Sequence, residues 1–334
     1  MPDAEAAPLD LVIIGAGPAG MAAAIAAKQR GLRYVVLEQA ALVNSLLHYP
    51  TDMIFFTTPD LMEIGGLPFV SPHEKPTRQE ALKYYRRVAD TFALDIRFDE
   101  PVTSLAIDAG GAFCVGSEPR GGVAVMRMAR AVVVASGAYD FPNRLGIPGE
   151  DLPHVSHFYR EPHGHYRRHV VIVGGKNSAA ESALDLYRNG AASVTIVHRH
   201  AALGDSIKYW VKPDIENRIT EGSIAARFNT RVVEITPAGV VVEGPAGREA
   251  LPADFVYLLT GYRSDLSLLR SVGAAIDQTQ GAPVLNADTF ETSVPGLFVI
   301  GVAVAGKQSG KIFIENGRFH GDVAIREIAA RLMR

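Results

Sequence analysis

Residues 11–39 read LVIIGAGPAGMAAAIAAKQRGLRYVVLEQ, and this stretch predicts the fold of the N-terminal part of the chain. The continuous apolar run at 11–14 indicates a strand buried on both faces, and the turn from Gly15 to Gly20 leads into a helix that continues to about Arg30. Gly31 is placed to end that helix, and a second buried strand follows at 34–37. This order is the pattern of a dinucleotide-binding βαβ unit.

Residues 169–199, HVVIVGGKNSAAESALDLYRNGAASVTIVHR, repeat the same design. We expect a strand at 170–173, a glycine turn, a helix to about Arg188 that Gly190 ends, and a strand at 194–197. Two such units predict an α/β chain with two Rossmann-like, three-layer dinucleotide-binding domains. The chain would then carry two nucleotide sites.

The residues of both turns match what a pyrophosphate requires. It binds where the unpaired N–H groups and the positive dipole end of a helix face the anion. A Cβ at Gly17 would push the phosphates away, so this glycine matters most in the first turn. The second turn has Lys176 where the pattern GxGxxA has its second glycine, which places a cation near the pyrophosphate instead.

The second strands of the two βαβ units end in side chains of opposite charge. Glu38 stands where an acid accepts hydrogen bonds from ribose hydroxyls, which selects an unphosphorylated ribose as in FAD or NAD. The other unit presents Arg199 between His198 and His200, and a guanidinium there suits a 2′-phosphate. We therefore expect NADPH to be preferred over NADH, with Lys208 as a second partner of the 2′-phosphate.

Composition excludes several classes of function. The net charge of −3 argues against a nucleic-acid binder, which needs a basic stripe. The single cysteine, Cys114, excludes both a disulfide scaffold and a CxxC redox pair. Because free cysteines are mostly buried, we expect Cys114 to be a packed residue of a strand rather than a nucleophile.

An uncharged run covers residues 11–27, near the lower limit for a membrane span. The preceding residues MPDAEAAPLD are acidic, and the glycine turn interrupts the run. We therefore expect a cytoplasmic protein that does not bind membranes, with residues 1–8 as a frayed tail.

Three further strand ends carry glycine and are candidate cofactor contacts. They are Ala135-Ser136-Gly137, Thr260-Gly261 and Gly301, each directly after an apolar run. Glycine at such a place lets the backbone pass close to a cofactor or serve as a hinge.

The order of these motifs resembles the thioredoxin-reductase-like, two-dinucleotide-binding flavoproteins. The motifs are GAGPAG with Glu38, ASG at 135–137, GGKNSA with His-Arg at 198–199, LTGYR at 259–263 and GLFVIG at 296–301. Three segments are similar to the bacillithiol disulfide reductase branch, the YpdA-type oxidoreductases: HYPTDMIFFTT at 48–58, IKYWVKPDIENRI at 207–219 and KIFIENGRFHG at 311–321.

The resemblance implies a discontinuous FAD domain, residues 1–137 and 262–334, into which an NADPH domain of residues 138–261 is inserted. The implied FAD contacts are Gly15, Gly17, Pro18, Ala19, Gly20, Glu38, Gln39, Asn44, Ser45, Val102, Ala135, Ser136, Gly137, Gly301, Val302, Lys311 and Ile312. The implied NADPH contacts are Gly174, Gly175, Lys176, Asn177, Ser178, Ala179, His198, Arg199, His200, Lys208, Thr260 and Gly261.

The implied geometry near the flavin places a backbone N–H at Lys311–Phe313, at the start of the C-terminal helix, against the flavin O2. An apolar stripe on that helix, with Ile325 and Ile328, closes the FAD domain. Pro148-Gly149 and Gly261 are candidate hinges for a rotation between the domains. A homodimer or homotetramer is implied as well.

The chain departs from the family in the residues that carry redox chemistry. Residues 151–174 hold no CxxC, Ala19 replaces the cysteine typical of YpdA-type enzymes, and Val302 replaces the aspartate that holds the ribityl chain. The flavin itself is then the redox centre. His157, near the place of the missing CxxC, is the one candidate for proton transfer.

The function implied is an NADPH-dependent, FAD-containing oxidoreductase whose acceptor is a low-molecular-weight disulfide such as bacillithiol disulfide. Three alternatives stay open: an NADPH:ferredoxin or flavodoxin reductase, a reductase of a thioredoxin-like partner, and a non-enzymatic flavin or NADPH sensor. No metal site is expected, because the histidines at 154, 157, 163, 165 and 169 match no standard ligand spacing. Trp210 is expected to anchor helix packing.

Overall fold

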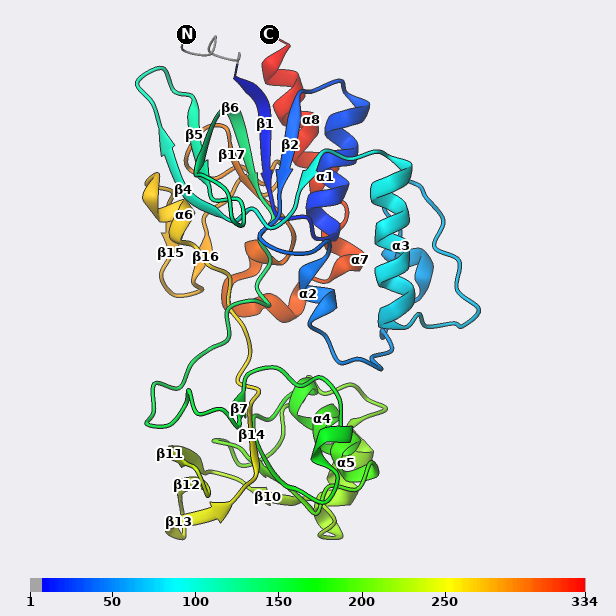
Figure 1. Cartoon of the computed structure of the whole chain (residues 1–334), viewed down its shortest axis with the longest axis vertical. Coiled ribbons are helices and arrows are strands. Elements are labelled where there is room, and N and C mark those ends of the chain that lie inside the picture. Colours follow the sequence, from blue (N-terminus) through cyan, green and yellow to red (C-terminus); the bar gives the residue numbers. More distant parts are fainter. Residues whose placement is uncertain (1–7, 334) are drawn as a thin grey trace. The chain divides into compact units, whose positions relative to one another are not determined.

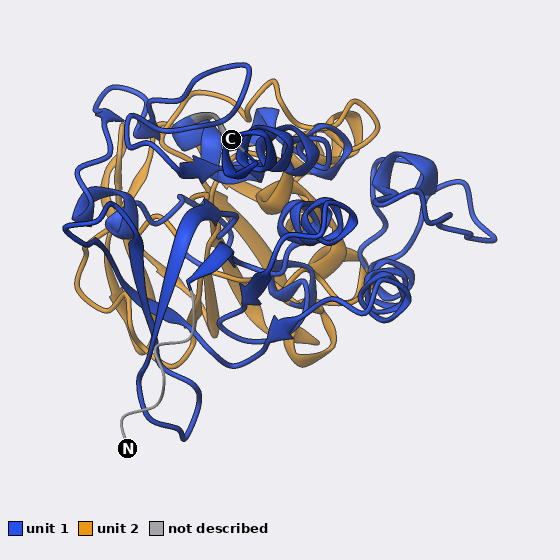
Figure 2. Cartoon of the chain, turned by 90° about the horizontal axis from the view of Figure 1, so that it is seen from above, with its two compact units in different colours: residues 1–47, 53–141, 262–334 blue, residues 48–52, 142–261 orange. Residues whose placement is uncertain are grey.

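The computed structural model describes residues 8–333, without the side chains of Gln308 and Ser309. Most of the predicted N-terminal tail lies outside these residues. The chain divides into two compact units: unit 1 comprises residues 1–47, 53–141 and 262–334, and unit 2 comprises residues 48–52 and 142–261 (Figure 2). Unit 2 is therefore formed almost wholly by a segment that interrupts unit 1 in sequence.

Unit 1 is built on a seven-stranded sheet of order β3-β2-β1-β6-β5-β4, with β17 paired to β6 (Figure 1). Its strands are β1 Leu9–Ile14, β2 Tyr34–Leu37, β3 Ile96–Arg97, β4 Val102–Ile107, β5 Phe113–Ser117, β6 Val125–Val134 and β17 Leu297–Val299. The pairs β1–β2, β1–β6, β2–β3 and β6–β17 are parallel, whereas β4–β5 and β5–β6 are antiparallel.

Both faces of this sheet are buried, as the unbroken apolar strands predict. Leu11 and Ile13 of β1 face a core shared with α1 Pro18–Gln29 and α8 His320–Leu332. Val12 and Ile14 face the opposite core, which contains side chains of β4, β5 and α6 Ser267–Ser271. The predicted stripe of the C-terminal helix is confirmed, since Ile325 is fully buried in the first core.

The remaining elements of unit 1 are short, except for α3 and η3. They are α2 Asn44–Leu47, η1 Pro59–Met62, α3 Arg78–Thr91, β15 Ile276–Asp277, β16 Ala282–Pro283, η3 Gly301–Lys311 and α7 Ile314–Gly317. The longest, α3, begins at a capping box in which Thr77 accepts from the Glu80 N–H and Glu80 accepts from the Thr77 N–H.

Unit 2 is a three-layer structure on a five-stranded parallel sheet of order β10-β9-β8-β14-β7. Its strands are β7 Val155–Ser156, β8 His169–Val173, β9 Ser193–Val197, β10 Ala225–Arg227 and β14 Phe255–Leu258. One face packs on α4 Asn177–Arg188 and α5 Lys212–Thr220, and the other on the antiparallel strands β11 Arg231–Thr236, β12 Gly239–Gly244 and β13 Gly247–Pro252 (Figure 1). The short η2 His163–His165 completes this unit.

The helix ends lie where the glycines predict them. Helix α1 ends at Gln29 and α4 ends at Arg188, and both following glycines, Gly31 and Gly190, have positive φ (71° and 82°). A left-handed backbone conformation of this kind favours glycine at a helix end. The uncharged run at 11–27 is divided between β1 and α1. Among residues 8–333, no helix combines the length and the apolar character needed to cross a membrane.

One expected hinge is wrong. Pro148 and Gly149 lie inside unit 2, where the Pro148 carbonyl accepts from the Ile235 N–H at 2.9 Å. A Cβ on Gly149 would lie 1.9 Å from the Ile235 carbonyl oxygen, so this glycine is required for close packing on β11. The unit borders fall instead between residues 141 and 142 and between Gly261 and residue 262.

Candidate functional site: two glycine turns

The first glycine turn joins β1 to α1 and leaves space in front of the helix. A Cβ on Gly15 would lie 2.6 Å from the Ala135 carbonyl oxygen, and one on Gly20 would lie 2.0 Å from the Gly15 carbonyl oxygen. The outer glycines therefore close the turn. Gly17, in contrast, caps α1 without a side-chain hydrogen bond, and a Cβ there would meet no atom within 4 Å. This arrangement presents a helix N-terminus to an anion.

Half of the predicted FAD residues of other segments surround this turn. A Cβ on Gly301 would lie 2.9 Å from the Ala19 Cβ, and one on Gly137 would lie 3.9 Å from the Ser45 hydroxyl. Ile312 belongs to the same group, because a Cβ on Gly317 would contact both its side chain (3.4 Å) and the Gly301 Cα (3.5 Å). The group comprises Gly15, Gly17, Pro18, Ala19, Gly20, Ser45, Ala135, Ser136, Gly137, Gly301 and Ile312.

Glu38 ends β2 as a buried carboxylate with backbone partners. It is 4% exposed and accepts from the Ala16 N–H at 2.7 Å, a contact that ties the end of β2 to the glycine turn. Burial raises the pKa of Glu38 above its ordinary value, against the amide hydrogen bonds that lower it. Gln39 and Asn44 both donate to Asp140, at 2.8 and 3.4 Å. Asp140 was not found by sequence analysis, because it belongs to no motif and meets these residues only in the fold.

Three other predicted FAD residues lie outside the turn group. Val102 begins β4, and Val302 lies within η3. Lys311 is the last residue of η3 and accepts from the Asn316 side-chain amide at 2.9 Å. A helix does begin at this place, since Phe313 is the N-cap of α7 and its N–H donates to the Asn316 side chain at 2.8 Å. The long C-terminal helix α8 is a separate element that begins at His320.

The first turn fits the diphosphate and flavin parts of FAD. The Ser136 hydroxyl, directly after β6, is buried and has no hydrogen-bond partner among the described residues. A buried hydroxyl without a partner is costly, and a polar ligand atom would satisfy it. Together with the open space at Gly17, it makes these residues a suitable cradle for a dinucleotide.

The second glycine turn joins β8 to α4. A Cβ on Gly174 would lie 2.7 Å from the Leu259 carbonyl oxygen, and one on Gly175 would lie 2.3 Å from the His198 ring. Gly174 is therefore required for packing against the backbone, and a side chain at Gly175 would have to displace the His198 ring. Lys176 is exposed and has extended backbone (φ −120°), so the departure from glycine costs no strain. Asn177, Ser178 and Ala179 form the first turn of α4, whose N-terminus has no side-chain cap.

The end of β9 carries the predicted 2′-phosphate residues. Arg199 and His200 are exposed and adjacent, with the Arg199 Nε 3.2 Å from the His200 Nε2. Burial of His198 against the turn lowers its pKa, and the neighbouring His200 and Arg199 lower it further. Lys208 is near the same turn, since its N–H donates to Asn177 at 2.9 Å, while its ammonium group pairs with Glu181 at 2.5 Å. Sequence analysis did not find Glu181 as this partner.

The last predicted NADPH residues follow β14. The Thr260 hydroxyl donates to the Asn143 carbonyl at 2.6 Å, and the Asn143 N–H donates to the Gly261 carbonyl at 2.9 Å. Gly261 has a positive φ of 89°, which favours glycine. Asn143, which joins the two chain segments at this border of unit 2, carried no signal in the sequence.

His157 is held within unit 2. Its Nε2 lies 3.4 Å from a Glu150 carboxylate oxygen, and burial lowers its pKa while Glu150 opposes this shift. The other histidines of the cluster are dispersed: His165 hydrogen-bonds Tyr257, and His169 hydrogen-bonds Ser193. No three His, Cys, Asp or Glu residues within 8–333 are grouped in a way that could hold a metal ion.

Trp210 is not the buried anchor that the sequence suggested. Its side chain is 45% exposed, and its ring lies edge-on to the still more exposed Tyr209 at 4.8 Å. Both lie directly after Lys208 and before α5, and neither belongs to the core cluster that packs on the helix face of the unit 2 sheet.

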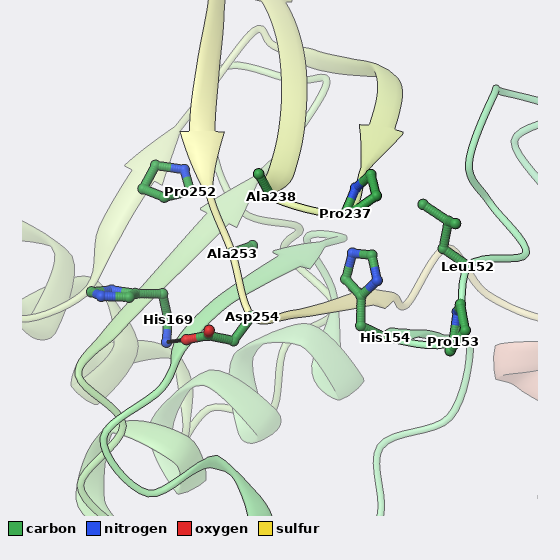
Figure 3. Close-up of a pocket in the computed structure, with 9 residues that line it drawn as sticks. All are labelled: Leu152, Pro153, His154, His169, Pro237, Ala238, Pro252, Ala253 and Asp254. Atoms are coloured by element: carbon green, nitrogen blue, oxygen red, sulfur yellow. Dashed lines mark hydrogen bonds between the residues drawn. The ribbon is translucent and has the colours of Figure 1, made fainter.

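One cavity of about 360 Å³ in unit 2 contains none of the predicted site residues (Figure 3). Its lining residues are Leu152, Pro153, His154, His169, Pro237, Ala238, Pro252, Ala253 and Asp254. The Asp254 carboxylate there accepts from the His169 N–H at 2.7 Å, across the end of β8. The glycine turns are separate from this cavity.

Cys114 is a strand residue, as expected. It lies half-buried in β5, with its Sγ 3.4 Å from the Met128 Sδ of the paired strand. We expect Cys114→Ser to leave both NADPH-dependent flavin reduction and disulfide turnover unchanged, because the thiol only fills space between strands. Steady-state and single-turnover rates measure this. A variant without turnover but with normal FAD content would contradict it.

The comparisons with known proteins agree with this geometry. Residues 12–301 match the family model described as pyridine nucleotide-disulphide oxidoreductase. Bacilliredoxin reductase Bdr of Bacillus subtilis (strain 168) is 38% identical over 96% of this chain and 97% of its own length. The structure of bacillithiol disulfide reductase Bdr (YpdA) from Bacillus cereus is also 38% identical, with a TM-score of 0.94 over 97% of this chain and 99% of that one.

A thioredoxin reductase of T. acidophilum has the same fold, with a TM-score of 0.75 at 20% identity over 98% of this chain and 99% of that one. These findings confirm the resemblance and the predicted cofactors. The chain belongs to the pyridine nucleotide-disulphide oxidoreductase family, and it is an oxidoreductase that uses FAD and NADPH.

Proposed function

We propose that this protein uses NADPH to reduce an external disulfide of low molecular weight, such as bacillithiol disulfide. The observation that carries the proposal is the pair of glycine turns with opposite ribose-end chemistry, the buried carboxylate of Glu38 in unit 1 and the exposed guanidinium of Arg199 in unit 2. The relative from Bacillus cereus, named a bacillithiol disulfide reductase, supports the class of acceptor.

We assign FAD to unit 1 and NADPH to unit 2. The N-terminus of α1 at Gly17 holds the FAD pyrophosphate, Ser136 offers its unpartnered hydroxyl, and Glu38 orients the adenosine ribose. In unit 2 the N-terminus of α4 holds the NADPH pyrophosphate beside Lys176, and Arg199 binds the 2′-phosphate. When bound, these cofactors supply hydride and electron transfer, which no side chain of the protein can provide.

The protein contributes no relay of its own thiols. Cys114 is the one cysteine of the sequence, and Ala19 occupies the glycine turn where related enzymes carry a cysteine. The acceptor therefore brings the only disulfide to the site. The balance is NADPH plus one proton plus the disulfide giving NADP⁺ and two thiols, so one proton comes from solvent or from a group such as His157.

The redox chemistry of a lone, half-buried thiol is compatible with the reducing cytoplasm, where we place the enzyme. We also propose a homodimer or homotetramer as its working form, in line with the resemblance to thioredoxin reductases.

Anaerobic stopped-flow experiments test the acceptor. The protein is reduced with NADPH, and reoxidation of the flavin band is followed after mixing with bacillithiol disulfide, a thioredoxin-like protein or ferredoxin. We expect fast reoxidation by the disulfide. Fast reoxidation by ferredoxin with an inert disulfide would establish the electron-carrier alternative, and reoxidation by the thioredoxin-like protein alone would make a protein the acceptor. Slow turnover with all three would favour a sensor.

A further inference from the structure

Thr57 presents a buried hydroxyl that the protein itself leaves without a partner. Its side chain is 7% exposed, and its Oγ1 has no hydrogen-bond partner among the described residues. The adjacent side chains alternate in burial: Phe55 and Thr57 are buried, whereas Ile54 is exposed. Phe55 and Thr57 therefore point into the interior of unit 1 together.

The segment that carries Thr57 is fixed on both sides. Before it, the Phe55 N–H donates to the Pro76 carbonyl at 2.9 Å. After it, the guanidinium of Arg318 donates to the carbonyls of Asp60 and Glu63, at 2.6 and 2.8 Å. The backbone on both sides of Thr57 is thus anchored within unit 1.

This segment adjoins the group of predicted FAD residues. The Phe56 ring packs edge-on against Phe313, with centroids 5.1 Å apart. Phe313 directly follows Ile312, which reaches the Gly301 turn through Gly317. Thr57 therefore directly follows Phe56, which contacts Phe313. The resemblance places the flavin ring at Lys311–Phe313.

We propose that the Thr57 hydroxyl is a direct hydrogen-bonding contact of the flavin ring of FAD. The inference rests on the assignment of FAD to unit 1. A buried hydroxyl without a partner destabilises the protein, and a polar atom of the bound ring removes that cost. The contact also adds a polar group on a chain where Val302 has replaced the aspartate of related enzymes.

The test uses the full chain with and without FAD. Thr57→Val removes the hydroxyl at nearly constant volume, Thr57→Ser keeps it, and Thr58→Val is the matched control on the neighbouring threonine, which is less buried. Flavin fluorescence gives the FAD Kd, and thermal melting gives the stability of each apoprotein.

We expect Thr57→Val to raise the FAD Kd about fivefold, as for a lost hydrogen bond between uncharged groups, while its apoprotein melts no earlier than the wild type. Thr57→Ser and Thr58→Val should bind FAD nearly as the wild type does. An unchanged Kd in Thr57→Val would overturn the inference, and so would equal weakening in Thr57→Ser. If the apoprotein of Thr57→Val melted several degrees earlier than the wild type, the hydroxyl would have a hydrogen-bond partner within the protein. That result would overturn the inference too. Failure of the wild type to bind FAD would instead contradict the proposed function.

Discussion

Gly17→Val is expected to weaken FAD binding strongly while leaving the fold intact. A Cβ at Gly17 meets no protein atom within 4 Å, and its backbone (φ −73°, ψ 176°) suits any residue, so the apoprotein should melt close to the wild type. The branched side chain instead fills the space of the pyrophosphate at the N-terminus of α1. Losing charge-assisted hydrogen bonds there should weaken FAD binding by about a hundredfold or more.

Fluorescence titration of the apoprotein with FAD measures this effect. Gly164→Val is the matched control, because a Cβ on this glycine of unit 2 also meets no atom within 4 Å. It should bind FAD normally. Gly15→Ala provides the contrast, since its φ of +105° and its approach to Ala135 make the fold itself fail. Normal FAD affinity in Gly17→Val would refute the assignment of the FAD pyrophosphate to this turn.

Arg199→Ala is expected to change the choice between the two nicotinamide cofactors. Loss of a guanidinium that binds the 2′-phosphate should raise the KM for NADPH by about tenfold, the lower end for charge-assisted hydrogen bonds because the side chain is exposed. The KM for NADH should hardly change. Arg248→Ala, which removes another exposed arginine of the same unit, should affect neither. Equal losses for NADPH and NADH in Arg199→Ala would refute the assignment.

The elements that bind nucleotides were predictable because their signals are local. Apolar runs buried on both faces, glycines with positive φ at helix ends and the two glycine turns all depend on neighbours in sequence. For this reason β2 is found at 34–37 and α4 ends at Arg188, as expected. The core stripe of α8 follows from its periodicity in the same way.

The partners of the site residues were not predictable, because they meet only after folding. Asp140 joins Gln39 and Asn44 from a segment about a hundred residues away, and Asn143 meets Thr260 across a similar gap. The division of the C-terminal helical segment into α7 and α8 was not predicted either, although a helix does begin after Phe313. The prediction for Trp210 was wrong for a related reason. The presence of an aromatic residue before a helix does not determine whether its side chain packs in the core.

The most direct measurement of the central claim is an anaerobic titration of the holoenzyme with NADPH, followed at the flavin absorbance band. Without a thiol relay, about one NADPH per FAD should bleach the flavin completely, and Cys114→Ser should give the same endpoint. An endpoint near two NADPH per FAD would reveal a second redox centre in the protein and contradict direct reduction of the external acceptor. If NADPH never bleached the flavin, the conclusion that the protein is an NADPH-dependent oxidoreductase would be contradicted.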